Sequence, residues 1–147
     1  MTRVRLDCGG PGDVAREDAS PDRKHVRTIL LVDDDESIRF AVGQLLEVLG
    51  YRVITASGGE DALRVFTERV SEIAAVVLDL TMPVMSGADV LRGLRRIEPR
   101  VKVLLSSGHE RDNLLDQGVE TRSVAFLKKP YLVSTLQKEL ETLLESR

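Results

Sequence analysis

Four apolar stretches of the sequence end in polar groups that could do chemistry. The first stretch ends in the acidic run 33–35, and "VVLD" ends at Asp79; "SSG" at 106–108 and "KKP" at 128–130 follow two later stretches. Taken singly, each has an ordinary explanation, because an aspartate can cap a helix or begin a turn and a lysine can simply be solvated. Taken together, they offer carboxylates, a hydroxyl and an ammonium group.

The acidic residues among them predict a magnesium site. Asp33, Asp34 and Asp79 would bring three carboxylates close to one point, and such a group either raises a pKa or recruits a cation. Hard carboxylate oxygens without histidine or cysteine ligands favour Mg²⁺, which shares its shell with waters and phosphate oxygens. Lys129 adds a mobile positive charge and Ser107 a hydroxyl donor, both suited to an anion on the metal. We therefore predict a site for a phosphoryl group beside Mg²⁺.

A carboxylate can carry that phosphoryl group itself, as an aspartyl phosphate. Asp79 is the best candidate, because its strand is central if the strand order is 2-1-3-4-5. In-line transfer then needs mainly positioning and neutralisation of charge, which the metal and Lys129 can supply.

The elements that must position these residues begin at Thr28. From there apolar runs alternate with amphipathic stretches, which indicates an α/β fold with a parallel sheet covered by helices. The carboxyl ends of parallel strands share one edge of a sheet, and open α/β sheets bind ligands at that edge. The expected strands cover residues 28–33, 52–56, 74–79, 101–106 and 124–128.

Helical spacing of apolar residues predicts a helix after each strand. Asp35 can cap the first helix and Gly50 can end it, while Ser57 and Glu60 fit a capping box for the second. The remaining expectations concern the third to fifth helices. The third follows Gly87 and stops before Pro99, the fourth lies within 110–118, and the last covers about 132–145. The fourth is short and polar, so we expect it to be the least stable.

Composition limits the class of protein. A chain of 147 residues is most simply one domain, and residues 1–27 are rich in Gly, Pro and charge without periodicity, so we expect a disordered tail or linker before a domain at 28–147. Apolar runs are too short to span a bilayer, which predicts a cytoplasmic protein. The single cysteine, Cys8, excludes an intramolecular disulfide. The net charge of −3, with scattered Lys and Arg, argues against direct binding of nucleic acid.

Four stretches in this order, "ILLVDDDESIR", "VVLDLTMPVMSG", "KVLLSSGH" and "AFLKKPY", resemble the receiver domain of two-component response regulators. The resemblance covers essentially all of residues 28–147 and includes chemotaxis-type single-domain regulators. It implies a flavodoxin-like (βα)5 sandwich with the strand order 2-1-3-4-5. "MSGADVLRGLRRIEPRVKVLLSSGH" is also similar to receivers at the C-terminus of hybrid histidine kinases, so both a free-standing receiver and one detached from a kinase remain open.

The resemblance assigns roles by motif position. It implies that Asp79 is the phosphoacceptor and Asp34 a direct metal ligand, with Asp33 acting through metal-bound water and the backbone carbonyl of Thr81 completing the shell. Lys129, rather than its neighbour in the sequence, would contact the phosphoryl group.

Further roles concern switching and lifetime. The resemblance implies that Ser107 is the switch hydroxyl, that Phe126 takes the place of a rotating aromatic residue, and that the Lys129–Pro130 peptide is cis. An ordinary core role for Phe126 also stays open. We expect Thr81 and His109 to set the rate of dephosphorylation, because a hydrolytic water must pass them; for His109, a solvated loop residue is an equal alternative.

The resemblance also implies partners. A sensor histidine kinase or histidine phosphotransfer protein would donate the phosphoryl group, and a downstream protein would bind the face made by the fourth helix, fifth strand and fifth helix. The chain would then be a signalling phosphoacceptor of a two-component system or phosphorelay, catalysing only its own phosphorylation and dephosphorylation. Two alternatives stay open: a receiver-like binding module that is not phosphorylated, and a haloacid-dehalogenase-like Mg²⁺ phosphohydrolase. The latter needs a second aspartate two residues after the nucleophile, where this chain has Thr81.

Overall fold

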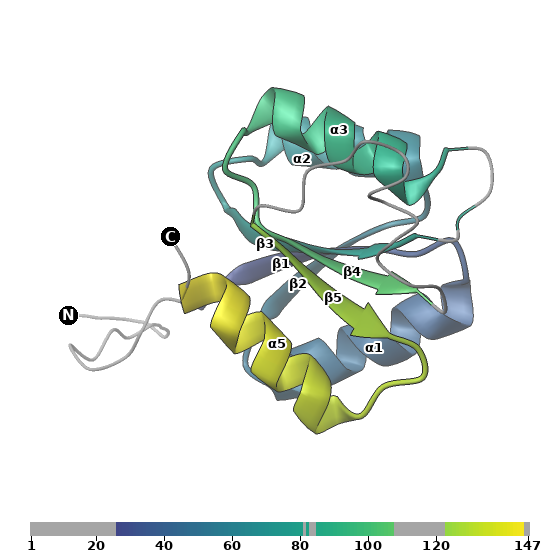
Figure 1. The fold of residues 1–147 in the computed structure, drawn as a ribbon, viewed down its shortest axis with the longest axis vertical. Coiled ribbons are helices and arrows are strands. Elements are labelled where there is room, and N and C mark those ends of the chain that lie inside the picture. Colours follow the sequence, from purple (N-terminus) through teal and green to yellow (C-terminus); the bar gives the residue numbers. More distant parts are fainter. Residues whose placement is uncertain (1–25, 81, 83–84, 108–122, 146–147) are drawn as a thin grey trace, which may run out of the picture.

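The computed structural model describes residues 26–80, 82, 85–107 and 123–145. Five parallel strands form one sheet in the order β2-β1-β3-β4-β5, as predicted. The strands are β1 (Thr28–Val32), β2 (Arg52–Ala56), β3 (Ile73–Asp79), β4 (Val103–Ser107) and β5 (Val124–Lys128). The described helices are α1 (Glu36–Val48), α2 (Gly59–Glu68), α3 (Gly87–Ile97) and α5 (Val133–Glu145). Figure 1 shows α1 and α5 on one face of the sheet and α2 and α3 on the other.

Two predicted segments lie outside the described residues. One is the predicted fourth helix within 110–118, and the other is nearly all of the predicted N-terminal tail, of which only residues 26 and 27 are described. Both stay predictions. Among the described residues, no helix combines the length and hydrophobicity that a membrane crossing requires.

The strands bury side chains on both faces, which explains their unbroken apolar sequences. In β3, Val76 and Leu78 pack into a cluster with α2 and α3, whereas Ala75 and Val77 pack into a second cluster with α1 and α5. This alternation follows from the two-residue repeat of a strand. The sheet is therefore the shared middle layer of two separate cores.

Strand ends differ from the prediction by one or two residues. The first strand ends at Val32, one residue before Asp33, and the fourth covers 103–107 instead of 101–106. The Val101 N–H donates to the carbonyl of Glu98 at 3.0 Å, so Val101 belongs to the turn after α3. Regular strand pairing therefore starts later than the apolar sequence suggested.

Most predicted helix ends are confirmed, but the capping box is wrong. Asp35 caps α1 by accepting a hydrogen bond from the Ile38 N–H at 3.1 Å. In α2, however, Gly58 takes the capping position and no side chain caps the helix. Because the helix begins one residue later than expected, Asp61 occupies the third helical position, and its carboxylate accepts a hydrogen bond from the Ser57 N–H at 3.2 Å.

The third helix has a cap that the sequence reasoning did not name. The Ser86 hydroxyl accepts a hydrogen bond from the Asp89 N–H at 3.1 Å. As predicted, the helix ends before Pro99, where Glu98 takes an extended conformation.

Candidate functional site

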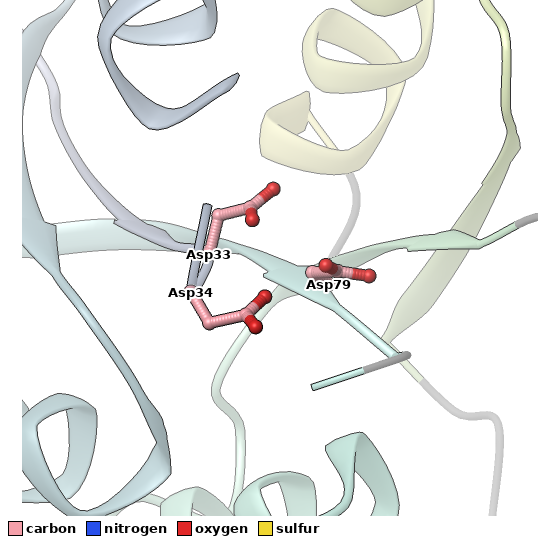
Figure 2. A group of neighbouring side chains, drawn as sticks. All are labelled: Asp33, Asp34 and Asp79. Atoms are coloured by element: carbon pink, nitrogen blue, oxygen red, sulfur yellow. The ribbon is translucent and has the colours of Figure 1, made fainter. Parts of the chain in front are cut away.

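Three aspartates meet at the carboxyl edge of the sheet. Asp33 and Asp34 follow β1, and Asp79 is the last residue of the neighbouring strand β3. One carboxylate oxygen from each residue lies within 4.8 Å of those of the other two. Figure 2 shows Asp33 and Asp34 extending from the strand end on different sides, with both carboxylates on the side of Asp79. The prediction that the strand order brings these three residues together is confirmed.

Backbone contacts fix the acidic residues in place. Asp79 lies opposite Ser106 of β4 in the strand register, and the next N–H, that of Leu80, donates to the Ser106 carbonyl at 3.0 Å. On the other side, the Asp33 N–H bonds to the Ala56 carbonyl of β2 at 3.3 Å. The strand pairing therefore continues through the site.

The site is partly desolvated. Asp33 and Asp79 are buried, each about 4% exposed, whereas Asp34 is exposed. Burial raises the pKa of the Asp33 carboxyl above its usual value; the Asp35 N–H, which donates to Asp33 Oδ1 at 2.9 Å, opposes this shift. The negative charge of Asp79 raises the pKa of Asp33 further, and Lys129 lowers it.

Lys129 brings a positive charge to the two buried carboxylates. Its Nζ lies 3.5 Å from Asp79 Oδ1 and 3.9 Å from Asp33 Oδ2. The prediction that the Lys129–Pro130 peptide is cis is confirmed. Lys128, by contrast, is exposed.

The donor set fits a divalent cation. Three ionised carboxylates against one ammonium leave an excess of two negative charges, which a single Mg²⁺ would balance. All the side-chain donors of the cluster are oxygens, which are the ligands that Mg²⁺ prefers.

The other predicted site residues are placed less fully. Ser107 ends β4 opposite Lys128 of β5, at the same edge as the carboxylates. Phe126 is half-buried and packs against the α2–α3 core, opposite Leu105 in register. Thr81 and His109 lie outside the described residues.

Two residues near the cluster were not predicted from the sequence. Arg39 in α1 donates through Nη1 to the backbone carbonyl of Asp33 at 2.7 Å. Tyr131 is half-buried in the α1–α5 core, and burial together with the charges of Asp33 and Asp79 raises the pKa of its phenol. Arg39 lies four residues after the capping Asp35, a spacing that would suggest a side-chain pair with Asp35 and not the bond to the Asp33 carbonyl.

Comparison with known proteins identifies the family. Residues 29–141 match the response regulator receiver domain. The chain belongs to the response regulator receiver domain family. This confirms the resemblance drawn from the sequence motifs and removes the support for the dehalogenase-like alternative.

Relatives of this receiver domain include parts of larger proteins. It is 32% identical to the sensor kinase CckA of Brucella abortus over 120 residues, which cover 82% of this chain and 13% of that kinase. The chain thus spans a small part of the length of this relative.

Solved structures share the fold. A receiver domain protein of Clostridium thermocellum has a TM-score of 0.74 and 32% identity, covering 81% of this chain and 94% of that one. The receiver domain of the sensor histidine kinase PA1611 of Pseudomonas aeruginosa PAO1, with a magnesium ion coordinated in its active site cleft, has a TM-score of 0.71 and 28% identity, covering 83% of this chain and all of that one.

Proposed function

We propose that this receiver domain accepts a phosphoryl group from a phosphohistidine onto Asp79 with the help of Mg²⁺. The observation that carries the proposal is the convergence of three carboxylates and Lys129 at one sheet edge, with the Lys129 ammonium 3.5 Å from the Asp79 carboxylate. The magnesium ion coordinated in the PA1611 receiver supports the same assignment.

The proposed chemistry is an in-line displacement. A carboxylate oxygen of Asp79 attacks phosphorus, the bond from phosphorus to the donor's imidazole nitrogen breaks, and its electron pair leaves with the imidazole. When bound, Mg²⁺ would neutralise charge on the phosphoryl oxygens. Asp34 would hold it directly, Asp33 through water, and the backbone carbonyl of Thr81 would complete the protein ligands.

Lys129 and Ser107 serve the transferred group. The Lys129 ammonium already lies beside the attacking carboxylate, so it can pair with phosphoryl oxygens without a large rearrangement. In the proposal, Ser107 binds the phosphoryl group after transfer, and Phe126 changes its packing in response. Thr81 and His109 then limit access of the hydrolytic water and so set the rate of dephosphorylation. The protein catalyses only its own phosphorylation and dephosphorylation.

An apolar rim beside the carboxylates suits a protein donor. Ile38 and Phe40 at the start of α1 are exposed, as are Leu132 and Val133 at the start of α5, and these two helices cover the same face of the sheet. Both helices start at the edge that carries Asp79. A histidine kinase or phosphotransfer protein that contacts this rim would bring its phosphohistidine to the acceptor. We assign the downstream partner to the face of the predicted fourth helix, β5 and α5.

Labelling by acetyl phosphate tests the acceptor. With Mg²⁺, the wild-type chain should gain one acid-stable, base-labile phosphoryl group by intact mass, and Asp79→Asn should gain none. Asp89→Asn, an exposed aspartate on α3, is the matched control and should be labelled normally. Labelling of Asp79→Asn at the wild-type rate would contradict the proposal.

Beryllofluoride with Mg²⁺ separates a phosphoacceptor from a pure binding module. A phosphoacceptor should bind it at Asp79, with changes in the spectra of residues near Ser107 and Phe126. A module that is never phosphorylated should show no such change.

A further inference from the structure

Arg39 contacts the backbone of the acidic cluster, although it belongs to the first turn of α1 and not to a strand end. Its Nη1 donates to the Asp33 carbonyl at 2.7 Å in a partly buried position. That carbonyl belongs to the peptide that joins Asp33 to Asp34. A contact there determines how this peptide plane is oriented.

The rest of the connection between β1 and α1 is tied to the same point. The Asp35 N–H bonds to the Asp33 carboxylate at 2.9 Å, and the Asp35 carbonyl accepts the Arg39 N–H at 2.8 Å. The Arg39 side chain then returns to the Asp33 carbonyl. These bonds form a closed loop in which the first turn of the helix holds the end of the strand.

We propose that Arg39 is a positioning residue for the metal site of this receiver domain, acting by holding the peptide between Asp33 and Asp34. Consecutive residues at a strand end direct their side chains to opposite faces, so both carboxylates reach the same cation only if this peptide keeps one orientation. The inference rests on the proposed function, because it assumes that the cluster binds Mg²⁺.

The positioning role and the plain electrostatic role of Arg39 predict opposite effects. If Arg39 acted only as a nearby positive charge, its removal would strengthen binding of a cation, most clearly at low salt. If it holds the peptide, its removal weakens Mg²⁺ binding at every ionic strength. Loss of a group that orients a metal ligand commonly lowers affinity by about 10- to 100-fold.

The experiment is a calorimetric titration of the full chain with Mg²⁺ alone, at low and high salt. Arg39→Met should weaken binding about 10-fold, and Arg39→Lys, which keeps a donor and the charge, should recover part of the loss. Arg52→Met removes the same charge at the opposite end of the sheet and should bind like the wild type. Equal or tighter binding by Arg39→Met would overturn the inference.

A second measurement needs no metal. Hydrogen exchange of the Asp35 N–H, which bonds to the Asp33 carboxylate, should become faster in Arg39→Met and stay unchanged in Arg52→Met. Unchanged exchange at Asp35 would also count against the inference. Failure of the wild-type chain to bind Mg²⁺ would instead contradict the proposed function, and the exchange data would still decide the role of Arg39.

Discussion

The Lys129 ammonium lies between the proposed acceptor and a second buried carboxylate, 3.5 Å from Asp79 Oδ1 and 3.9 Å from Asp33 Oδ2. Under the proposed function, a metal ion and the phosphoryl oxygens would both approach this same region. Lys129 would then compete with the metal in the resting state and assist the phosphoryl group during transfer.

Replacing Lys129 should affect these two steps in opposite directions. In Lys129→Met, loss of the competing charge should tighten Mg²⁺ binding severalfold, while phosphorylation by acetyl phosphate should slow by about 100-fold, as for other lost transition-state donors. Mg²⁺ titration and the rate of labelling measure the two effects separately.

Lys128→Met is the matched control, because it removes the same charge from the exposed neighbouring position. Its labelling rate should stay within about twofold of the wild type, as expected for a surface charge. Equal losses in both variants would mean that the position of Lys129 next to Asp79 has no special importance.

Asp33 should make stability depend on pH in metal-free buffer. Because the pKa of folded Asp33 is raised above 3.8, the folded state holds this proton more tightly than the unfolded state. The stabilisation that comes from this tighter proton binding is complete below pH 3.8 and is lost as the pH rises through the raised pKa of Asp33.

Asp33→Asn removes this titration and keeps an oxygen for the Asp35 N–H. We expect the variant to be more stable than the wild type by about 1 kcal/mol near neutral pH without metal, with the difference shrinking toward acid. Urea unfolding between about pH 4.5 and 7.5 measures it. Added Mg²⁺ should reverse the order by stabilising the wild type, and a difference that grew toward acid would contradict the sign of the shift.

Gly87 packs against the backbone that follows Asp79, the proposed acceptor. A Cβ at this position would lie 2.8 Å from the Leu80 Cα, and Leu80 directly follows Asp79. Gly87→Ala should therefore displace the acceptor, lower the free energy of unfolding by about 1–3 kcal/mol and slow labelling by acetyl phosphate. Thermal unfolding and the labelling rate check both effects.

Gly93→Ala provides the comparison within the same helix. There a Cβ would meet the end of the Leu63 side chain, at 2.7 Å from Cδ2, and that side chain can move. The higher helix propensity of alanine, about 1 kcal/mol, should offset the repacking. A loss of labelling in Gly93→Ala equal to that of Gly87→Ala would indicate a general effect on the α2–α3 core.

Phe40 should affect the rate of phosphoryl transfer from a protein donor but not from acetyl phosphate. Its side chain is 67% exposed near the start of α1, so Phe40→Ala should leave stability almost unchanged. We expect transfer from a phosphorylated histidine kinase or phosphotransfer protein to slow by about 10-fold, the size expected for a central interface residue. Labelling by acetyl phosphate should not change.

Val48→Ala is the control on the same helix. Val48 is 83% exposed at the end of α1 that points away from the carboxylates, and its replacement should leave both donors unaffected. Equal slowing in Phe40→Ala and Val48→Ala would place the donor along the whole helix instead of at the rim.

The sequence predicted the parts of the fold that depend on local pattern. Apolar runs and helical spacing indicated a parallel sheet with Asp33, Asp34 and Asp79 at its carboxyl edge, and the resemblance to receiver domains implied the strand order that the structure shows. The capping prediction for the second helix was wrong because two consecutive glycines allowed a later start. That choice depends on packing, since a Cβ on Gly59 would meet Met85 and Val90 of the same α2–α3 core.

Contacts that support the site were harder to predict. Arg39 donates to the backbone carbonyl of Asp33. Every residue type has such a carbonyl, so the sequence does not indicate this contact. The charges of Asp33 and Asp79 raise the pKa of Tyr131 because the pairing of β5 with β4 brings the segment after β5 to the edge that carries these aspartates. Such effects depend on three-dimensional distance and not on spacing along the chain.

The two separate cores have a consequence for how this domain can diversify. In the described part of the chain, the α2–α3 cluster and the α1–α5 cluster have no residue in common, and the sheet lies between them. Mutations on one side can therefore be accepted without compensating changes on the other. A lineage could remodel the side that meets one partner while the opposite side, and the chemistry at the sheet edge, stay as they were.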